Sequence, residues 1–270
     1  HPLRPGIEPL RVSTADGVVL SGVVVRAPTG AAAPVGRPLT FVVAHGFTNS
    51  TARPPFTRLA GWLSRFGEVR ALDFRGHGRS GGRSTVGDLE VLDLDAVVNW
   101  ARQLGYSRVA TVGFSMGGSV VLRHAGGEYG GVDAVVAVSS PARWYYRGTA
   151  PMRRLHWIVT RPAGRLVSRV GLKTRIHSRD WDPVPLSPVE AVPYIAPTPL
   201  LIVHGDRDGY FPLDHPLALA AAAGEGGAEL WIERGFGHAE NAADRGLLDR
   251  IGRWLTDRVP GFPGSEPDGP

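Results

Sequence analysis

A serine stands between two glycines in the segment Gly113-Phe114-Ser115-Met116-Gly117. A β-like apolar run, 108–112, precedes this segment, and a helix-like run, 119–124, follows it. A serine at a strand-to-helix junction is presented on a sharp, strained turn, where a side chain at position 113 or 117 would crowd the backbone. The pattern predicts a nucleophile elbow, with the Ser115 hydroxyl attacking an acyl carbon.

A serine hydroxyl needs a base to take its proton, and the base needs a carboxylate to orient it. Of the nine histidines, His238 is favoured because it follows the last predicted strand and lies downstream of the serine, in the loop 235–240. The segment 204–208 offers two carboxylates after an earlier strand. Asp208 is favoured as the acid, because Asp206 lies closer to the strand end and suits a turn-capping role.

The attacked carbonyl oxygen becomes negatively charged and needs hydrogen-bond donors that are already in place. The backbone N–H of Met116 is one candidate, since it would begin the helix after the serine. The backbone N–H of Phe47 is the second candidate, in a His-Gly-Phe turn that follows the apolar strand 39–44. The other interpretation of that turn is an ordinary strand end. No metal or organic cofactor is expected.

Short apolar runs alternate along the chain with amphipathic segments. Strands are expected at 10–13, 18–25, 39–44, 69–73, 108–112, 132–138, 199–204 and 228–232. Helices are expected at 54–65, 88–104, 119–125, 213–223 and 239–258. This alternation predicts an α/β protein with a mostly parallel eight-stranded sheet covered by helices on both faces. Proteins with such a sheet bind their ligands at the carboxyl ends of the strands, and all the candidate catalytic residues follow strands at that edge.

The regular alternation breaks between residues 139 and 195, which carry short helical pieces, several prolines and many aromatic residues. This segment is interpreted as a small cap inserted into a core made of 1–138 and 196–259. The Pro- and Gly-rich tail 260–270 is expected to be disordered. An apolar acyl pocket is expected, although the cap aromatics could equally anchor the cap to the core. Its candidate residues are Phe47, Trp144, Tyr145, Tyr146 and Trp157.

The composition, 43% hydrophobic and 20% charged over 270 residues, is that of a globular protein. The absence of cysteine excludes disulfides, thiolate metal sites and a cysteine nucleophile. No apolar stretch is long enough to predict a membrane span. The first residues carry no apolar core of the signal-peptide type, so a cytoplasmic location is expected, with export after removal of a signal left open.

The positive charge is concentrated in the predicted cap. Residues 139–179 contain ten Lys or Arg and no Asp or Glu, whereas the whole chain has a net charge of +5. This charge could attract anionic ligands, phospholipid headgroups or acidic partners, or it could be an arginine-rich surface without a partner. Nucleic-acid binding is not expected, because no recognised binding module accompanies the charge.

Five motifs in order make the chain resemble a serine hydrolase of the α/β-hydrolase fold, of the esterase, monoacylglycerol-lipase-like or serine aminopeptidase-like group. They are 45–47, the turn Asp73-Phe74-Arg75-Gly76-His77-Gly78-Arg79-Ser80, 113–118, 204–208 and 237–238. The turn 73–80 is a structural element in that family. The resemblance implies that Ser115, Asp208 and His238 form a catalytic triad beneath a compact cap.

The expected reaction is hydrolysis of a small carboxylic ester with an apolar acyl group, through an acyl-enzyme on Ser115 and without a cofactor. Thioester or amide cleavage would use the same residues and stays open. Two alternatives lie outside hydrolysis: a ligand-binding protein that retains the pocket, and a membrane-surface protein whose basic cap docks on anionic lipid.

Overall fold

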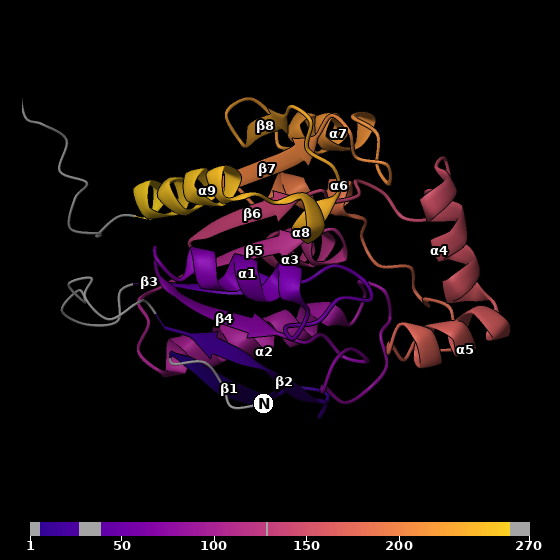
Figure 1. Cartoon of the computed structure of the whole chain (residues 1–270). Helices are drawn as coiled ribbons and strands as arrows, with labels where there is room; N and C mark the ends of the chain where they lie inside the picture. The colour runs from indigo at the N-terminus through magenta and orange to yellow at the C-terminus, as the bar shows by residue number, and fades with distance from the viewer. Residues whose placement is uncertain (1–5, 27–38, 128, 260–270) are drawn as a thin grey trace, which may run out of the picture.

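The structure, a computed structural model, describes residues 6–26, 39–127 and 129–259. Its centre is an eight-stranded sheet with the strand order β1-β2-β4-β3-β5-β6-β7-β8 (Figure 1). The strands are β1 Ile7–Ser13, β2 Val19–Val25, β3 Leu39–Ala44, β4 Glu68–Leu72, β5 Arg108–Phe114, β6 Ala134–Val138, β7 Leu200–Gly205 and β8 Glu229–Glu233. The pairs β1–β2 and β2–β4 are antiparallel and the other pairs are parallel, which confirms the predicted sheet.

Helices cover both faces of the sheet because its inner strands are apolar on both sides. In β3, Phe41 and Val43 join one core cluster and Val42 and Ala44 join the other, as the two-residue period of a strand requires. The first cluster includes residues of α1 (Pro54–Leu63) and α9 (Arg245–Arg258). The second includes residues of α2 (Glu90–Gln103), α3 (Met116–Gly126) and α7 (Asp214–Ala222).

The closing helix differs from its prediction. One helix was expected over 239–258, but the chain forms a short α8 (Ala239–Ala242) and then the separate α9. The Asp244 side chain accepts a hydrogen bond of 2.8 Å from the backbone N–H of Leu247 and so caps the start of α9. Aspartate at this position satisfies an N–H that has no partner inside the helix, which favours a new helix start there.

The segment 139–195 leaves the sheet after β6 and returns to it at β7. It contains α4 (Ala150–Thr160), α5 (Pro162–Gly171), α6 (Pro188–Ala191) and the 3₁₀ turn η1 (Val192–Tyr194). Figure 1 shows α4 and α5 standing beside the sheet rather than against either of its faces. The two helices approach closely at Gly164, where a Cβ atom would lie only 2.4 Å from the Trp157 carbonyl oxygen.

One sequence prediction, the disordered tail at 260–270, falls outside the described residues. Within the described part of the chain, no helix is both long enough and apolar enough to cross a bilayer.

The turn 73–80 forms a buried polar network around Arg75, whose side chain is 3% exposed. Its guanidinium contacts the fully buried carboxylate of Asp93 at 2.8 Å and the partly exposed carboxylate of Asp16 at 2.8 Å. The Asp73 carboxylate accepts hydrogen bonds from the backbone N–H of Thr51 (2.6 Å) and of Arg79 (3.1 Å). Through these contacts the turn 73–80 connects the segments that carry Asp16, Thr51 and Asp93.

Candidate active site

Ser115 sits on a strained turn between β5 and α3, with a φ of 53°. A non-glycine residue rarely adopts a positive φ, and here the flanking glycines make it possible. A Cβ at Gly113 would lie 2.1 Å from the Gly117 carbonyl oxygen, and a Cβ at Gly117 would lie 2.3 Å from the Ala44 carbonyl oxygen. The expected crowding at 113 and 117 is therefore confirmed.

The structure brings together the three side chains that the sequence singled out. The Nε2 atom of His238 lies 2.9 Å from the Ser115 hydroxyl oxygen, and its Nδ1 atom lies 2.8 Å from Asp208 Oδ2. These residues follow β5, β7 and β8, so the parallel strands deliver them to the same edge of the sheet. With Nδ1 protonated, the geometry leaves Nε2 free to accept the serine proton.

The Asp208 carboxylate is buried and is held by its own loop. Its Oδ1 atom accepts hydrogen bonds from the backbone N–H groups of Tyr210 (2.8 Å) and Phe211 (3.1 Å). Burial raises the pKa of the Asp208 carboxyl, but the hydrogen bond and charge of His238 and the two backbone N–H groups lower it by more. The pKa lies below its ordinary value, so the carboxylate is ionised at neutral pH.

The competing residues occupy other positions. The Asp206 carboxylate accepts a hydrogen bond of 2.6 Å from the backbone N–H of Gly235 and does not contact His238. The Nε2 atom of His204 lies 2.8 Å from the Phe211 carbonyl oxygen, in the loop that carries Asp208. His77 accepts from the backbone N–H of Thr48 at 3.2 Å. Burial, followed by the neighbouring His45, lowers the pKa of His77 well below its usual value.

The His-Gly-Phe turn after β3 lies against the serine. A Cβ at Gly46 would lie 3.3 Å from Ser115 Cβ, and Phe47 and Met116 line the same cavity as the serine. His45 is fully buried and its Nε2 atom accepts a 3.1 Å hydrogen bond from the backbone N–H of Phe74. Met116 begins α3, where backbone N–H groups have no partner within the helix.

Sequence reasoning missed Glu240, a buried carboxylate that reaches the His-Gly-Phe turn. Its Oε1 atom accepts a 2.5 Å hydrogen bond from the backbone N–H of Gly46, and its side chain is almost entirely hidden from solvent. The signal that could have found it was its position two residues after His238. No local motif marks its partner.

Tyr210 was also missed. Its ring stacks on the His238 imidazole with the centroids 4.2 Å apart and the planes 23° apart. Its carbonyl oxygen accepts a 2.9 Å hydrogen bond from the Thr149 hydroxyl, at the start of α4. The tyrosine therefore contacts both the imidazole and the segment 139–195.

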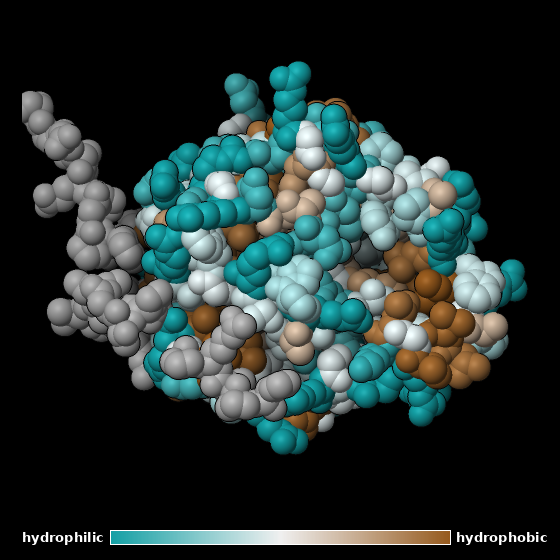
Figure 2. Space-filling model, in the orientation of Figure 1, coloured by the Kyte–Doolittle hydropathy of each residue, from teal (hydrophilic) through white to brown (hydrophobic). Residues whose placement is uncertain are grey.

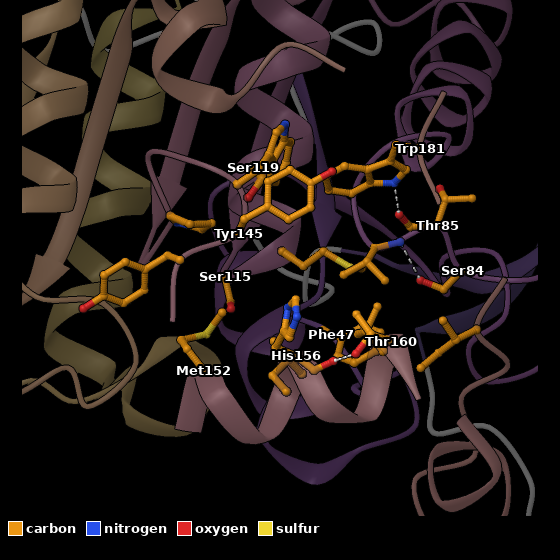
Figure 3. Close-up of a pocket in the computed structure, with 18 of the residues that line it drawn as sticks. Phe47, Ser84, Thr85, Ser115, Ser119, Tyr145, Met152, His156, Thr160 and Trp181 are labelled. Carbon is orange, nitrogen blue, oxygen red and sulfur yellow. Dashed lines mark hydrogen bonds between the residues drawn. The ribbon is translucent and has the colours of Figure 1, made fainter. Parts of the chain in front are cut away.

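A cavity of about 490 Å³ opens beside Ser115. Figure 3 shows Phe47 and Ser115 from the loops of the sheet and Met152, His156 and Thr160 from α4 around the same space. Four of the five aromatic residues that were expected to line this cavity do so: Phe47, Trp144, Tyr145 and Tyr146.

Trp157 departs from the expectation: it is absent from the lining and is 47% exposed. The inward face of α4 is built from residues three and four apart, and position 157 falls outside that stripe. Its members are Met152, Leu155, His156, Val159 and Thr160.

The cavity aromatics make contacts both to the core and within the segment 139–195. The ring of Tyr146 meets that of His215 in α7 edge-on, with the centroids 4.6 Å apart, so this residue serves both uses foreseen for the aromatics. The Trp144 indole N–H donates to the Pro185 carbonyl oxygen at 2.9 Å, and the Trp181 indole N–H donates to the Thr85 carbonyl oxygen at 2.7 Å. The two indole rings lie 5.0 Å apart. Within ranges 6–26, 39–127 and 129–259, no three His, Asp or Glu side chains cluster closely enough to hold a metal ion.

Comparison with known proteins agrees with this arrangement. The sheet, the serine turn and the similarity to known enzymes make the protein a serine hydrolase of the α/β-hydrolase fold. The chain belongs to the family described as serine aminopeptidase S33, which matches residues 38–187, more than half of its length.

Three individual proteins illustrate the similarity. A monoacylglycerol lipase from Mycolicibacterium smegmatis is 25% identical over 264 residues, which cover 81% of this chain and 88% of the lipase. An esterase from Pyrococcus furiosus superposes with a TM-score of 0.71 at 24% identity, covering 94% of this chain and 96% of the esterase. An α/β-hydrolase from a Penicillium species gives 0.71 at 19% identity, over 94% and 99%.

Proposed function

We propose that the protein hydrolyses carboxylic esters with an apolar acyl group, using Ser115 as nucleophile, His238 as base and Asp208 as the acid that orients it. The observation that carries the proposal is the unbroken chain from the serine hydroxyl through both imidazole nitrogens to the carboxylate, with distances of 2.9 and 2.8 Å. A matching mechanism follows from the chemistry of each group.

The reaction would proceed in two halves. The Ser115 oxygen forms a bond to the ester carbon while its proton passes to His238 Nε2, and the backbone N–H groups of Phe47 and Met116 stabilise the oxyanion. When the tetrahedral intermediate collapses, the proton passes from Nε2 to the leaving alcohol oxygen. A water then gives a proton to Nε2 and attacks the acyl-enzyme, and the serine regains its proton as the acid leaves.

The cavity supports an apolar acyl group. Met152, Leu155 and Val159 of α4 line the space beside the serine together with Phe47. Each methylene moved from water into such surroundings contributes about 0.8 kcal/mol, which corresponds to about fourfold in kcat/KM. Among p-nitrophenyl esters, kcat/KM is expected to rise from the acetate until the acyl chain fills the cavity.

Amide cleavage is the second candidate, because the family is named for aminopeptidases. An aminopeptidase has to bind a positively charged amino terminus. Among the described residues that line the cavity, Asp180 is the one carboxylate, against the guanidinium groups of Arg143 and Arg179. This balance favours esters over aminoacyl amides.

The test is a substrate series of p-nitrophenyl esters, acyl thioesters and aminoacyl p-nitroanilides, together with labelling by a fluorophosphonate. Ester turnover and labelling are both expected, and both should disappear in Ser115→Ala. Ser64→Ala, which changes a buried serine at the end of α1, is the matched control. Anilide turnover above ester turnover would contradict the ester proposal, and labelling that survives Ser115→Ala would contradict the assigned nucleophile.

A further inference from the structure

Large apolar side chains are left uncovered on the outer side of α4 and α5. Leu166 is 61% exposed and Val170 is 73% exposed. Val167 of α5 and Trp157 of α4 are about half exposed. We call these four residues the cap face. Figure 2 shows the corresponding apolar patch where α4 and α5 lie in Figure 1.

The orientation of α5 is the reverse of an ordinary amphipathic helix. The residues it buries are the small Gly164 and Ser168, which are one turn apart on the side that packs against the protein. Leu166 and Val170, also one turn apart, point to the other side and into solvent. A helix in a globular protein normally turns its large aliphatic residues inward, so this outward stripe indicates a surface that is covered by something else.

The segment that carries the cap face is strongly basic. Residues 139–179 carry ten Lys or Arg and no Asp or Glu. In the described part of the chain, Arg143 is the one member of this set that forms an ion pair, with Asp214. Arg161 and Arg169 are exposed at the start and end of α5. An exposed apolar stripe flanked by cations is the composition of a helix that lies in a membrane interface.

We propose that the cap face docks on anionic phospholipid bilayers. The aliphatic side chains of α5 enter the boundary between headgroups and acyl chains, and the surrounding arginines contact the lipid phosphates. A second copy of the chain fits less well, because a two-fold contact through α5 would bring the exposed Arg161 and Arg169 of one copy near those of the other. A nucleic acid would engage the cations but leave the aliphatic stripe exposed.

Docking would also place the cavity beside the membrane. The inward side of α4 lines the space next to Ser115, and its outward side contributes Trp157 to the cap face. An apolar ester could then pass from the bilayer to the serine along a single helix. The docking itself does not require the chemistry, so it can be tested with the Ser115→Ala protein even if the proposed hydrolysis is wrong.

The test is co-sedimentation of Ser115→Ala with vesicles of phosphatidylcholine alone, or of phosphatidylcholine mixed equally with phosphatidylglycerol. Binding is expected to the anionic vesicles at low salt, and added salt should weaken it. Leu166→Glu and Val170→Glu should each reduce the partition coefficient about tenfold or more. Leu217→Glu, at a 55% exposed leucine on α7, is the matched control and should bind normally.

The charges are tested separately. Arg161→Gln and Arg169→Gln should each reduce binding about fivefold, and Arg11→Gln, on the exposed side of β1, should not. Absence of binding at low salt, or equal losses in the control variants, would overturn the proposal. So would sedimentation velocity without lipid, if it revealed a dimer that Val170→Glu dissociates, because the cap face would then be a contact between copies.

Discussion

The Glu240 carboxylate accepts a 2.5 Å hydrogen bond from the backbone N–H of Gly46, across 194 positions of sequence. Both carboxylate oxygens lie within 3.3 Å of the place that a Cβ at Gly46 would occupy, which in turn is 3.3 Å from Ser115 Cβ. Glu240 follows the loop that carries His238. The hydrogen bond therefore joins the segment that carries His238, the proposed base, to the His-Gly-Phe turn. In that turn the next backbone N–H, that of Phe47, is the proposed oxyanion donor.

Glu240→Ala is expected to lower kcat about tenfold or more with little change in KM, because a misplaced oxyanion donor weakens transition-state binding more than substrate binding. Glu240→Gln should retain most activity, since its amide oxygen can still accept from Gly46. Steady-state kinetics on the preferred p-nitrophenyl ester measures both constants.

The matched control for Glu240 is Asp133→Ala. Asp133 also accepts a backbone hydrogen bond, from Val109 at 2.7 Å, but at the amino end of β5 and far from the serine. This variant should lose stability and keep kcat. If Glu240→Ala behaves in the same way, Glu240 only stabilises the fold.

Asp208→Asn is expected to reduce kcat about 10⁴-fold, because an amide can donate to His238 Nδ1 and hold the imidazole in the wrong tautomer. Asp206→Asn should have a small effect, since its amide oxygen can still accept from the backbone N–H of Gly235. Turnover of the same ester by the two purified variants decides between the acids. The reverse ranking would show that the acid is wrongly assigned.

Most of the fold could be predicted from the sequence because its signals are local. Each inner strand is a continuous apolar run, and each candidate catalytic residue follows such a run in a short turn. Once the strands are parallel, Ser115, Asp208 and His238 must reach the same edge, whatever the loops between them do.

The remainder depended on contacts that local patterns do not record. The bond between Glu240 and Gly46 exists only after β3 and α8 have come together. The direction of the Trp157 side chain depends on how α4 is rotated about its axis against the core. Helical periodicity in the sequence shows which residues share a face of α4, but not which of its faces turns toward the cavity. The break between α8 and α9 had a local signal, the capping residue Asp244, which the prediction of one helix over 239–258 did not use.

The buried pair of Arg75 and Asp93 makes a prediction about stability. Arg75→Met would leave the Asp93 carboxylate in the interior without its guanidinium partner, and breaking a buried pair in this way costs about 3–5 kcal/mol. The double variant Arg75→Met/Asp93→Leu should recover much of that loss, because it removes both charges. Urea unfolding measures the free energies. A single variant as stable as the double would show that Asp93 is readily neutralised or solvated.

His215 makes a prediction about acid pH. Its side chain is fully buried, and its Nδ1 atom accepts a 2.9 Å hydrogen bond from the backbone N–H of Ala142, which requires the unprotonated nitrogen. Burial, assisted by Arg143, lowers the pKa of His215 from 6.5 to about 4 in the folded state. The unfolded chain therefore binds the proton first, so this contribution to stability is complete above pH 6.5 and is lost as the pH falls toward 4. His215→Asn, whose amide oxygen can accept the same bond, should be less stable at neutral pH but should lose less stability between these two pH values. Parallel pH-dependent slopes for the two proteins in urea unfolding would assign the acid sensitivity to other groups, such as His77 or His204.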